Sequence, residues 1–306
     1  MSKFRKKSIY DIDGIIITHN KIYERIEGNP KHSIAFKSNN DGVVTVVKEV
    51  EWNISRYNVL IPRIRFDKIN LGSMVEYCTG FSGKYIFNNR IGKGTKIRVI
   101  LSGEVIPYIS EIIMPTYPEM PSMSYDWNET KIHCIALNNC VEYDKKGILY
   151  FIKTIKIDNL SVGLIDKLYN HGFNSIDKIL KIQYEELLKL DGIKETLAKK
   201  IYSNIHKIID NPIDLSLIMV GSLKFEMGLG IKKIKKILER YPNILNENVT
   251  VENIIEIDGF QEKTARQFVK NLKEFKMFLN NLNYLKYNVS EKNLQKYSKF
   301  KEVFLQ

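Results

Sequence analysis

Cysteine is scarce in this chain of 306 residues, which contains only Cys78, Cys134 and Cys140. So small a number excludes a small secreted domain held together by disulfides. The chain also lacks an N-terminal apolar leader segment, so we expect an intracellular, reducing setting, in the cytoplasm or the nucleus. Long apolar runs are lacking too, since no stretch approaches the roughly 18 residues of a membrane helix. A protein without membrane partners is therefore expected.

Acidic residues are fewer than basic ones, 35 against 47, which leaves a formal net charge of +12. Such an excess favours a polyanionic partner. The chain is also rich in Ile, Lys and Asn, a composition that an AT-rich genome produces by itself, so charge supports a nucleic-acid partner only beside other signals. The length and the 44% hydrophobic content favour two or three domains with cores of their own.

A short turn pattern recurs four times between residues 157 and 275. Its copies are Asn159-Leu160-Ser161, Gly192-Ile193-Lys194, Gly228-Leu229-Gly230 and Gly259-Phe260-Gln261. Each is followed by apolar residues spaced by three and four, as at Leu197, Ala198 and Ile201, which places them on one helix face. A unit of helix, tight apolar-centred turn and helix, repeated about every 33 residues, predicts an all-α domain of stacked or paired units.

This unit resembles the helix-hairpin-helix element of DNA repair and ligation proteins. The resemblance implies that backbone N–H groups at the start of each second helix bind a nucleic-acid phosphate, where the helix dipole is positive and glycine permits close approach. The DNA-binding residues assigned in this way are Gly192, Lys194, Gly228, Gly230, Lys232, Gly259, Lys263 and Arg266. A helical bundle for protein contacts is the alternative, because an ordinary solvated helix face also carries lysines.

Upstream of the repeats, short segments typical of strands alternate with turn residues and predict a small β-barrel. The expected strands are residues 43–50, 59–66, 96–101 and 105–113. Their order, with Trp52 and Arg56 after the first strand, resembles the OB-fold domain of NAD-dependent DNA ligases. In that family the barrel lies on the minor-groove side of the nick, which makes Arg56 and Arg63 candidate phosphate contacts. The family's arginine-bearing DNA-facing loop corresponds to Tyr77–Ser82 and has no arginine here; Trp52 is interpreted as a core residue.

Two further strands are expected before the barrel, at residues 9–17 and 33–37. Two strands cannot bury a core, so they belong either to a larger domain or to a sheet completed by another chain. Both resemble motifs that line the adenylation pocket of the same ligases, and this resemblance assigns Asp13, Gly14 and Lys37 to nucleotide binding. The lysine of the first motif is replaced here by Thr18.

The lysine that such ligases adenylate stands in a K-x-D-G motif well upstream of these strands, and we expect this chain to be without that region. One K-x-D-G string does occur, Lys189–Gly192. It falls inside the second hairpin unit, where Leu190 is expected to pack and Gly192 to turn, and a nucleophilic lysine needs a pocket that lowers its pKa. We therefore assign no catalytic residue and expect that the isolated chain is not a self-sufficient enzyme.

The segment between barrel and repeats holds four of the eight prolines, from Pro107 to Pro121, and is interpreted as a linker. The resemblance places a four-cysteine zinc finger after it, but only Cys134 and Cys140 remain. Zinc takes four thiolate or imidazole ligands, and thioethers do not replace them. We expect a finger-like hairpin without zinc, held by packing of Tyr125, Trp127 and Tyr143.

These features predict a multidomain α+β fold with a small OB-type β-barrel followed by an all-α tandem helix-hairpin-helix domain. The expected parts are an adenylation-domain remnant (1–40), the OB domain (41–114), linker and finger (115–150), the helical domain (151–279) and a tail too short for a BRCT domain (280–306). The resemblance implies nick sealing in replication or repair with NAD and Mg²⁺, nicked double-stranded DNA as partner, and a separate polypeptide carrying the adenylation half, in a cellular or viral setting. The alternatives are a non-catalytic DNA-binding factor and a protein-interaction scaffold derived from such a ligase.

Overall fold

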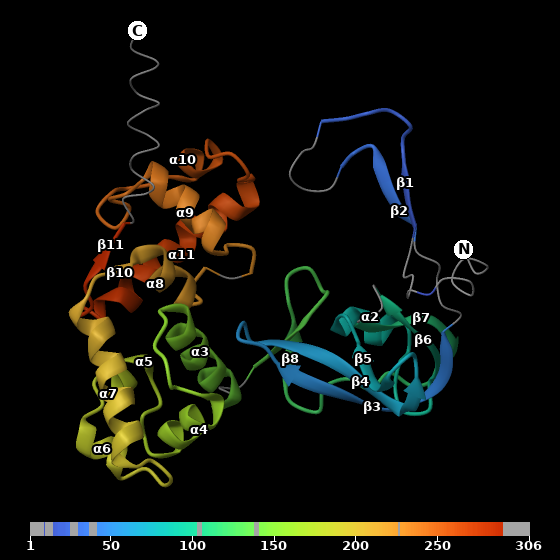
Figure 1. Ribbon diagram of the computed structural model, residues 1–306, viewed down its shortest axis with the longest axis horizontal. Helices are drawn as coiled ribbons and strands as arrows, with labels where there is room; N and C mark the ends of the chain where they lie inside the picture. Colours follow the sequence, from blue (N-terminus) through green and yellow to red (C-terminus); the bar gives the residue numbers. More distant parts are fainter. Residues whose placement is uncertain are drawn as a thin grey trace. The chain divides into compact units, whose positions relative to one another are not determined.

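The computed structural model describes residue 9 and residues 15–24, 30–36, 42–102, 106–137, 141–225 and 227–289. Contacts divide the chain into two compact units, residues 1–53 with 60–137, and residues 54–59 with 138–306 (Figure 1). Four residues assigned from the sequence lie outside the described ranges: Asp13, Gly14, Lys37 and Cys140. Within those ranges no helix is long and apolar enough to cross a membrane.

The first unit contains a five-stranded barrel. Its strands are β3 (Val43–Ile54), β4 (Val59–Asn70), β5 (Met74–Thr79), β6 (Lys96–Ser102) and β7 (Ile106–Met114). The hydrogen-bonded order is β3-β6-β7-β5-β4, and pairing of β3 with β4 closes the barrel. β5 pairs with β7 in parallel, and helix α2 (Gly83–Asn88) lies between β5 and β6 in the chain. The expected OB-type barrel is thereby confirmed, with β5 as a strand that the sequence pattern did not predict.

The barrel core follows from alternation along the strands, because successive side chains point to opposite faces of a sheet. Val47, Ile64, Phe66, Ile97 and Val99 are all buried, with at most 1% of each side chain exposed. Trp52, expected in the core, is half-buried, and its indole N–H donates to the carbonyl of Glu119 at 3.0 Å. Tyr77–Thr79, expected in a loop, form the end of β5 instead.

A small hairpin of β8 (Tyr125–Trp127) and β9 (Cys134–Ala136) extends the barrel sheet beyond β4. Trp127 makes edge contacts with Phe87 and with Tyr125, at ring-centre distances of 6.4 and 6.3 Å. Cys134 is fully buried, and a side-chain carbon placed on Gly83 would come within 2.5 Å of its sulfur. The hairpin is thus packed through Tyr125 and Trp127; Tyr143, the third residue expected there, lies on a helix of the other unit.

The expected N-terminal strands also exist within the described residues. β1 (Ile15–Thr18) and β2 (Ser33–Phe36) form an antiparallel two-stranded sheet in which Ile15 is opposite Phe36. Every residue of β1 is exposed. This sheet therefore presents apolar side chains to solvent.

The second unit is helical. Its helices are α3 (Val141–Thr154), α4 (Val162–Asn170), α5 (Ile176–Leu180), α6 (Tyr184–Leu188), α7 (Glu195–Asp210), α8 (Leu215–Gly221), α9 (Ile231–Arg240), α10 (Val251–Ile255) and α11 (Glu262–Asn280). Two short strands, β10 (Ile213–Asp214) and β11 (Tyr287–Asn288), pair in parallel. The unit also includes α3. The helical unit therefore begins before residue 151, where the helical domain was expected to start.

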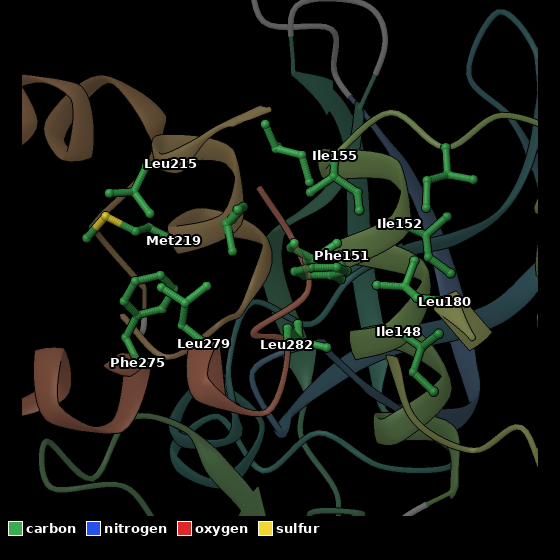
Figure 2. Close-up of a cluster of buried hydrophobic side chains, with 14 of the residues drawn as sticks. Ile148, Phe151, Ile152, Ile155, Leu180, Leu215, Met219, Phe275, Leu279 and Leu282 are labelled. Carbon is green, nitrogen blue, oxygen red and sulfur yellow. The ribbon is translucent and has the colours of Figure 1, made fainter. Parts of the chain in front are cut away.

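One hydrophobic core holds this unit together. Figure 2 shows side chains of α3, α5, α8 and α11 gathered in a single cluster, with Phe151, Leu180, Met219 and Phe275 among them. Phe151 and Phe275 are fully buried. Because burial of one such side chain contributes roughly 1.5–3 kcal/mol, this core fixes the helices and the turns between them.

Candidate nucleic-acid interface

The four repeated turns share one backbone conformation. The first residue of each lies in the left-handed region, with φ of 66° at Asn159, 76° at Gly192, 103° at Gly228 and 88° at Gly259. Glycine adopts this conformation without strain, and Asn does so more readily than other residues. The Asn that replaces glycine in the first copy therefore preserves the turn.

The middle residue of each turn anchors it to the core. Leu160, Ile193, Leu229 and Phe260 are only 4%, 7%, 4% and 7% exposed. With the middle side chain buried, the backbone on either side is held at the surface. This is the structural reason why an apolar residue stands at the centre of all four copies.

The third residue of each turn is the N-cap of the following helix. Ser161, Lys194, Gly230 and Gln261 precede α4, α7, α9 and α11, and each has extended backbone with ψ between 160° and 175°. Each of the four turns thus lies between two helices of the described chain. They present four helix N-termini, whose first-turn N–H groups have no partner within the helix.

The N-termini differ in how they are capped. The hydroxyl of Ser161 accepts from the Leu164 N–H at 3.3 Å and so occupies one amide of α4. At Lys194, Gly230 and Gln261, by contrast, the described structure has no side-chain cap. A side-chain carbon added at Gly228 or Gly230 would meet no described atom within 4 Å. Three of the four helix starts therefore have no side-chain cap in the described structure. The first turns of α7 and α11 contain Glu195 and Glu262, whereas that of α9 has no acidic residue. The dipole of a helix favours an anion at such a position.

Basic side chains surround these helix starts. Lys194, Lys232 and Lys263 are exposed next to the second, third and fourth turns. Arg266 is also exposed, but its guanidinium Nε donates to the carboxylate of Glu262 at 2.9 Å. This hydrogen bond raises the pKa of Arg266 above its ordinary value. The assigned hairpin residues thus lie together around the turns, with Arg266 partly neutralised.

Two lysines connect consecutive hairpins. Nζ of Lys167 on α4 donates to the carbonyl of Asp191, just before the second turn, at 2.7 Å. Nζ of Lys236 on α9 donates to the carbonyl of Asp258, just before the fourth turn, at 3.0 Å. Neither lysine is among the residues assigned to DNA binding from the sequence, although both stand at the same place in their repeats.

A shallow groove runs between the first two turns. Its volume is about 690 Å³, and its lining includes Asn159, Ser161, Gly163, Lys167 and Gly192. A side-chain carbon at Gly163 would meet no described atom within 4 Å, so backbone is accessible there as well. Room for a ligand beside two turns is what binding of a polymer backbone requires.

The barrel arginines have different surroundings. Arg63 is 2.6 Å from Glu51 and its guanidinium lies 4.0 Å from the centre of the Tyr77 ring. The neighbouring basic residues are also paired with acids: Arg65 with Glu49, Lys48 with Asp67, and Lys68 with Glu76. This strand face therefore carries balanced charge. Arg56 belongs to the segment that groups with the helical unit, where it lies 4.2 Å from the centre of the Tyr150 ring.

The K-x-D-G string has the structure of a packing element. Lys189 is exposed at the end of α6, Leu190 is 2% exposed, and Gly192 forms the second turn. An exposed lysine at a helix end lacks the enclosed pocket that an adenylated lysine needs. The interpretation of this string as structural is consistent with these surroundings.

Cys134 is the part of the expected finger remnant that lies within the described residues. The described residues contain no group of three or more His, Cys, Asp or Glu side chains that could hold a metal. Burial raises the pKa of the Cys134 thiol to about 11. Cys134 instead contributes its sulfur to the packing of the hairpin against α2.

Comparison with known proteins agrees with this geometry. Residues 151–207 match the family described as a SAM-like helix-hairpin-helix tandem. The DNA ligase of Acanthamoeba polyphaga mimivirus is 39% identical over 294 residues, which cover 92% of this chain and 46% of that protein. This chain is a relative of DNA ligases. It is 25% identical over 285 residues to the DNA ligase of Shewanella baltica and 26% identical over 279 residues to that of Lactobacillus johnsonii, covering 43% and 41% of those proteins. The chain thus spans less than half the length of these relatives.

Proposed function

We propose that this chain is the DNA-holding part of an NAD-dependent DNA ligase, which keeps a nicked duplex in place while the nick is sealed. The observation that carries the proposal is the fourfold turn geometry, with three open helix starts beside exposed lysines. Phosphate groups of the duplex would accept from the first-turn N–H groups of α7, α9 and α11. Because every step of a DNA strand has a phosphate, such binding is independent of sequence.

The OB barrel adds a second contact surface in this proposal. Arg63 is one candidate there, but its pairing with Glu51 means that a phosphate has to compete with a carboxylate already in place. Exposed ion pairs contribute only about 0–1 kcal/mol, so a phosphate can displace the glutamate. The hairpins are therefore the main determinants of affinity in this proposal and the barrel face is a weaker contributor.

NAD and Mg²⁺ belong to the complete ligase in this proposal. Their chemistry is activation of the 5′-phosphate by adenylate and neutralisation of phosphate charge. Asp13, Gly14 and Lys37 would contribute to the nucleotide pocket, and they lie outside the described residues. We therefore assign no step of adenylate transfer to a described side chain of this chain.

The β1–β2 sheet supports the proposal of an adenylation half on a further polypeptide segment. Ile16 is 74% exposed and Ile34 is 71% exposed. A two-stranded sheet is marginally stable by itself and gains stability when its apolar side chains are covered. We propose that it completes a larger sheet of the adenylation half and that the assembly acts on DNA inside the cell.

The test is a binding titration of the purified chain with a nicked duplex, an intact duplex and a single strand of equal length, over roughly 50–200 mM salt. The proposal predicts preference for duplex DNA and a log–log salt slope of several phosphate contacts. A chain that binds no DNA at the lowest salt would contradict it and favour the protein-interaction scaffold.

A second measurement separates a ligase part from a non-catalytic DNA-binding factor. The chain is incubated with NAD labelled on its adenylate, alone and with the N-terminal half of the mimivirus relative. Nick sealing that needs both polypeptides is expected. DNA binding without any sealing in the mixture would instead favour the non-catalytic factor.

A further inference from the structure

The two hairpin pairs of the helical unit contain the same inter-hairpin contact. The interval from Ser161 to Lys167 in α4 is the same as the interval from Gly230 to Lys236 in α9. Both lysines reach across to the next hairpin and donate to the carbonyl that immediately precedes its first glycine, at 2.7 and 3.0 Å. One contact of this kind could be incidental, but its recurrence at matching positions shows a repeated structural feature.

The lysine ammonium groups lie beside the glycines of these turns. A side-chain carbon on Gly192 would be 3.1 Å from Nζ of Lys167, and one on Gly259 would be 3.6 Å from Nζ of Lys236. Each ammonium is therefore close to the backbone that a phosphate approaches. Lys167 also lines the groove of about 690 Å³ between the first two turns.

An ammonium group has three N–H donors. The contact with the Asp191 carbonyl uses one donor of Lys167, and the side chain is otherwise exposed. The remaining donors can serve an acceptor in the groove while the first holds the turn. A single lysine can thus fix the backbone of one hairpin and bind an anion at the same place.

We propose that Lys167 and Lys236 are matched phosphate-binding residues, each of which holds the turn of the following hairpin and binds the DNA phosphate that lies against it. This inference rests on the proposed DNA binding and identifies two specific cationic contacts for it. The ligand is a backbone phosphodiester, because ammonium groups and backbone amides are the groups that bind phosphate oxygens.

The two sites differ in their acidic surroundings. Glu239, Glu256 and Asp258 line the hollow around Lys236, whereas the acidic residue that lines the groove around Lys167 is Asp158. Nζ of Lys236 is 3.1 Å from the carboxylate of Asp258, which is 99% exposed, whereas the contact of Lys167 with the second turn is to the backbone carbonyl of Asp191. The carboxylate competes with a phosphate for Lys236. The first hairpin pair is therefore the stronger phosphate site, and removal of the Asp258 charge strengthens the second.

The test compares Lys167→Met, Lys236→Met and Asp258→Asn with the wild-type chain in salt titrations on a nicked duplex. Lys178→Met is the matched control, because Nζ of Lys178 donates to the carbonyl of Gly172 at 3.1 Å, away from the hairpin turns. Each of the first two variants is expected to lower the log–log salt slope by about 1 and to weaken binding several-fold at low salt. Asp258→Asn is expected to tighten binding, and Lys178→Met to leave the slope unchanged.

Thermal unfolding of each variant separates phosphate binding from stability. A variant Lys167→Met that unfolds at a lower temperature but keeps the wild-type slope would overturn the inference, since the lysine would then be structural only. Lys167→Arg retains a cation and is expected to recover the slope. Wild-type binding with unchanged slopes in both lysine variants overturns this inference alone, whereas a wild-type chain that binds no DNA overturns the proposed function as well.

Discussion

The guanidinium of Arg63 on β4 is 2.6 Å from the carboxylate of Glu51 on β3 and also covers the ring of Tyr77. The arginine thus has two partners on the barrel surface, a carboxylate and an aromatic ring. The negative carboxylate partly neutralises the guanidinium charge that would otherwise be available to a phosphate. The pairing therefore limits the net positive charge that this face presents.

The variant Glu51→Gln tests whether this face meets DNA. Removal of the carboxylate frees Arg63 and makes the face more positive, so binding to a nicked duplex at low salt should tighten by a few-fold. Protein stability should change by less than about 1 kcal/mol, because the pair is exposed. Unchanged affinity would mean that Arg63 does not face the duplex.

Replacing Gly228 by alanine tests the effect of backbone conformation alone. Its φ of 103° is unfavourable for a residue with a side chain, yet a carbon added there would meet no described atom within 4 Å. Gly228→Ala should therefore destabilise the helical unit by about 1–2 kcal/mol through backbone strain. The matched control is Gly230→Ala, since Gly230 has φ of −76° and an equally open surrounding. Denaturant unfolding that gave equal losses for the two variants would contradict the argument.

Ser161 caps a helix start that is open in the other three hairpins. Its replacement by glycine, the residue at the matching position of the third hairpin, releases the Leu164 N–H for a phosphate. Glycine at an N-cap costs only a few tenths of a kcal/mol. Ser161→Gly should therefore tighten DNA binding with little change in the unfolding midpoint, and weaker binding would show that the hydroxyl itself contacts DNA.

The two buried thiols predict a pH dependence of barrel stability. Burial raises the pKa of Cys78 to about 12 and that of Cys134 to about 11, against an ordinary value of 9.0. In the unfolded chain the thiols ionise at lower pH, so stability is fully present below pH 9 and is lost as the pH rises toward 11. Denaturant unfolding at pH 8 and pH 10.5 should show this loss. A double variant with alanine at both cysteines should lose less stability over the same interval.

Much of the fold was predictable because its signals are local. The four turns depend on a residue that tolerates positive φ, a buried apolar residue and a helix that follows at once, and all three features are readable within a few positions. The barrel strands were predictable for a similar reason, since alternation is local. β5 was missed because it is short and its residues are mostly half-buried, which gives no clear alternation.

The sequence by itself determined which segments turn, which helices follow and that the chain is strongly basic. Tertiary structure decided which charged side chains of different segments are paired. Lys167 meets the Asp191 carbonyl because two hairpins pack side by side, and Arg63 meets Glu51 because strand pairing sets their register. Such contacts join residues far apart in the chain, and side chains of one charge look alike in a sequence. Their partners are fixed only when the core places the backbones next to one another.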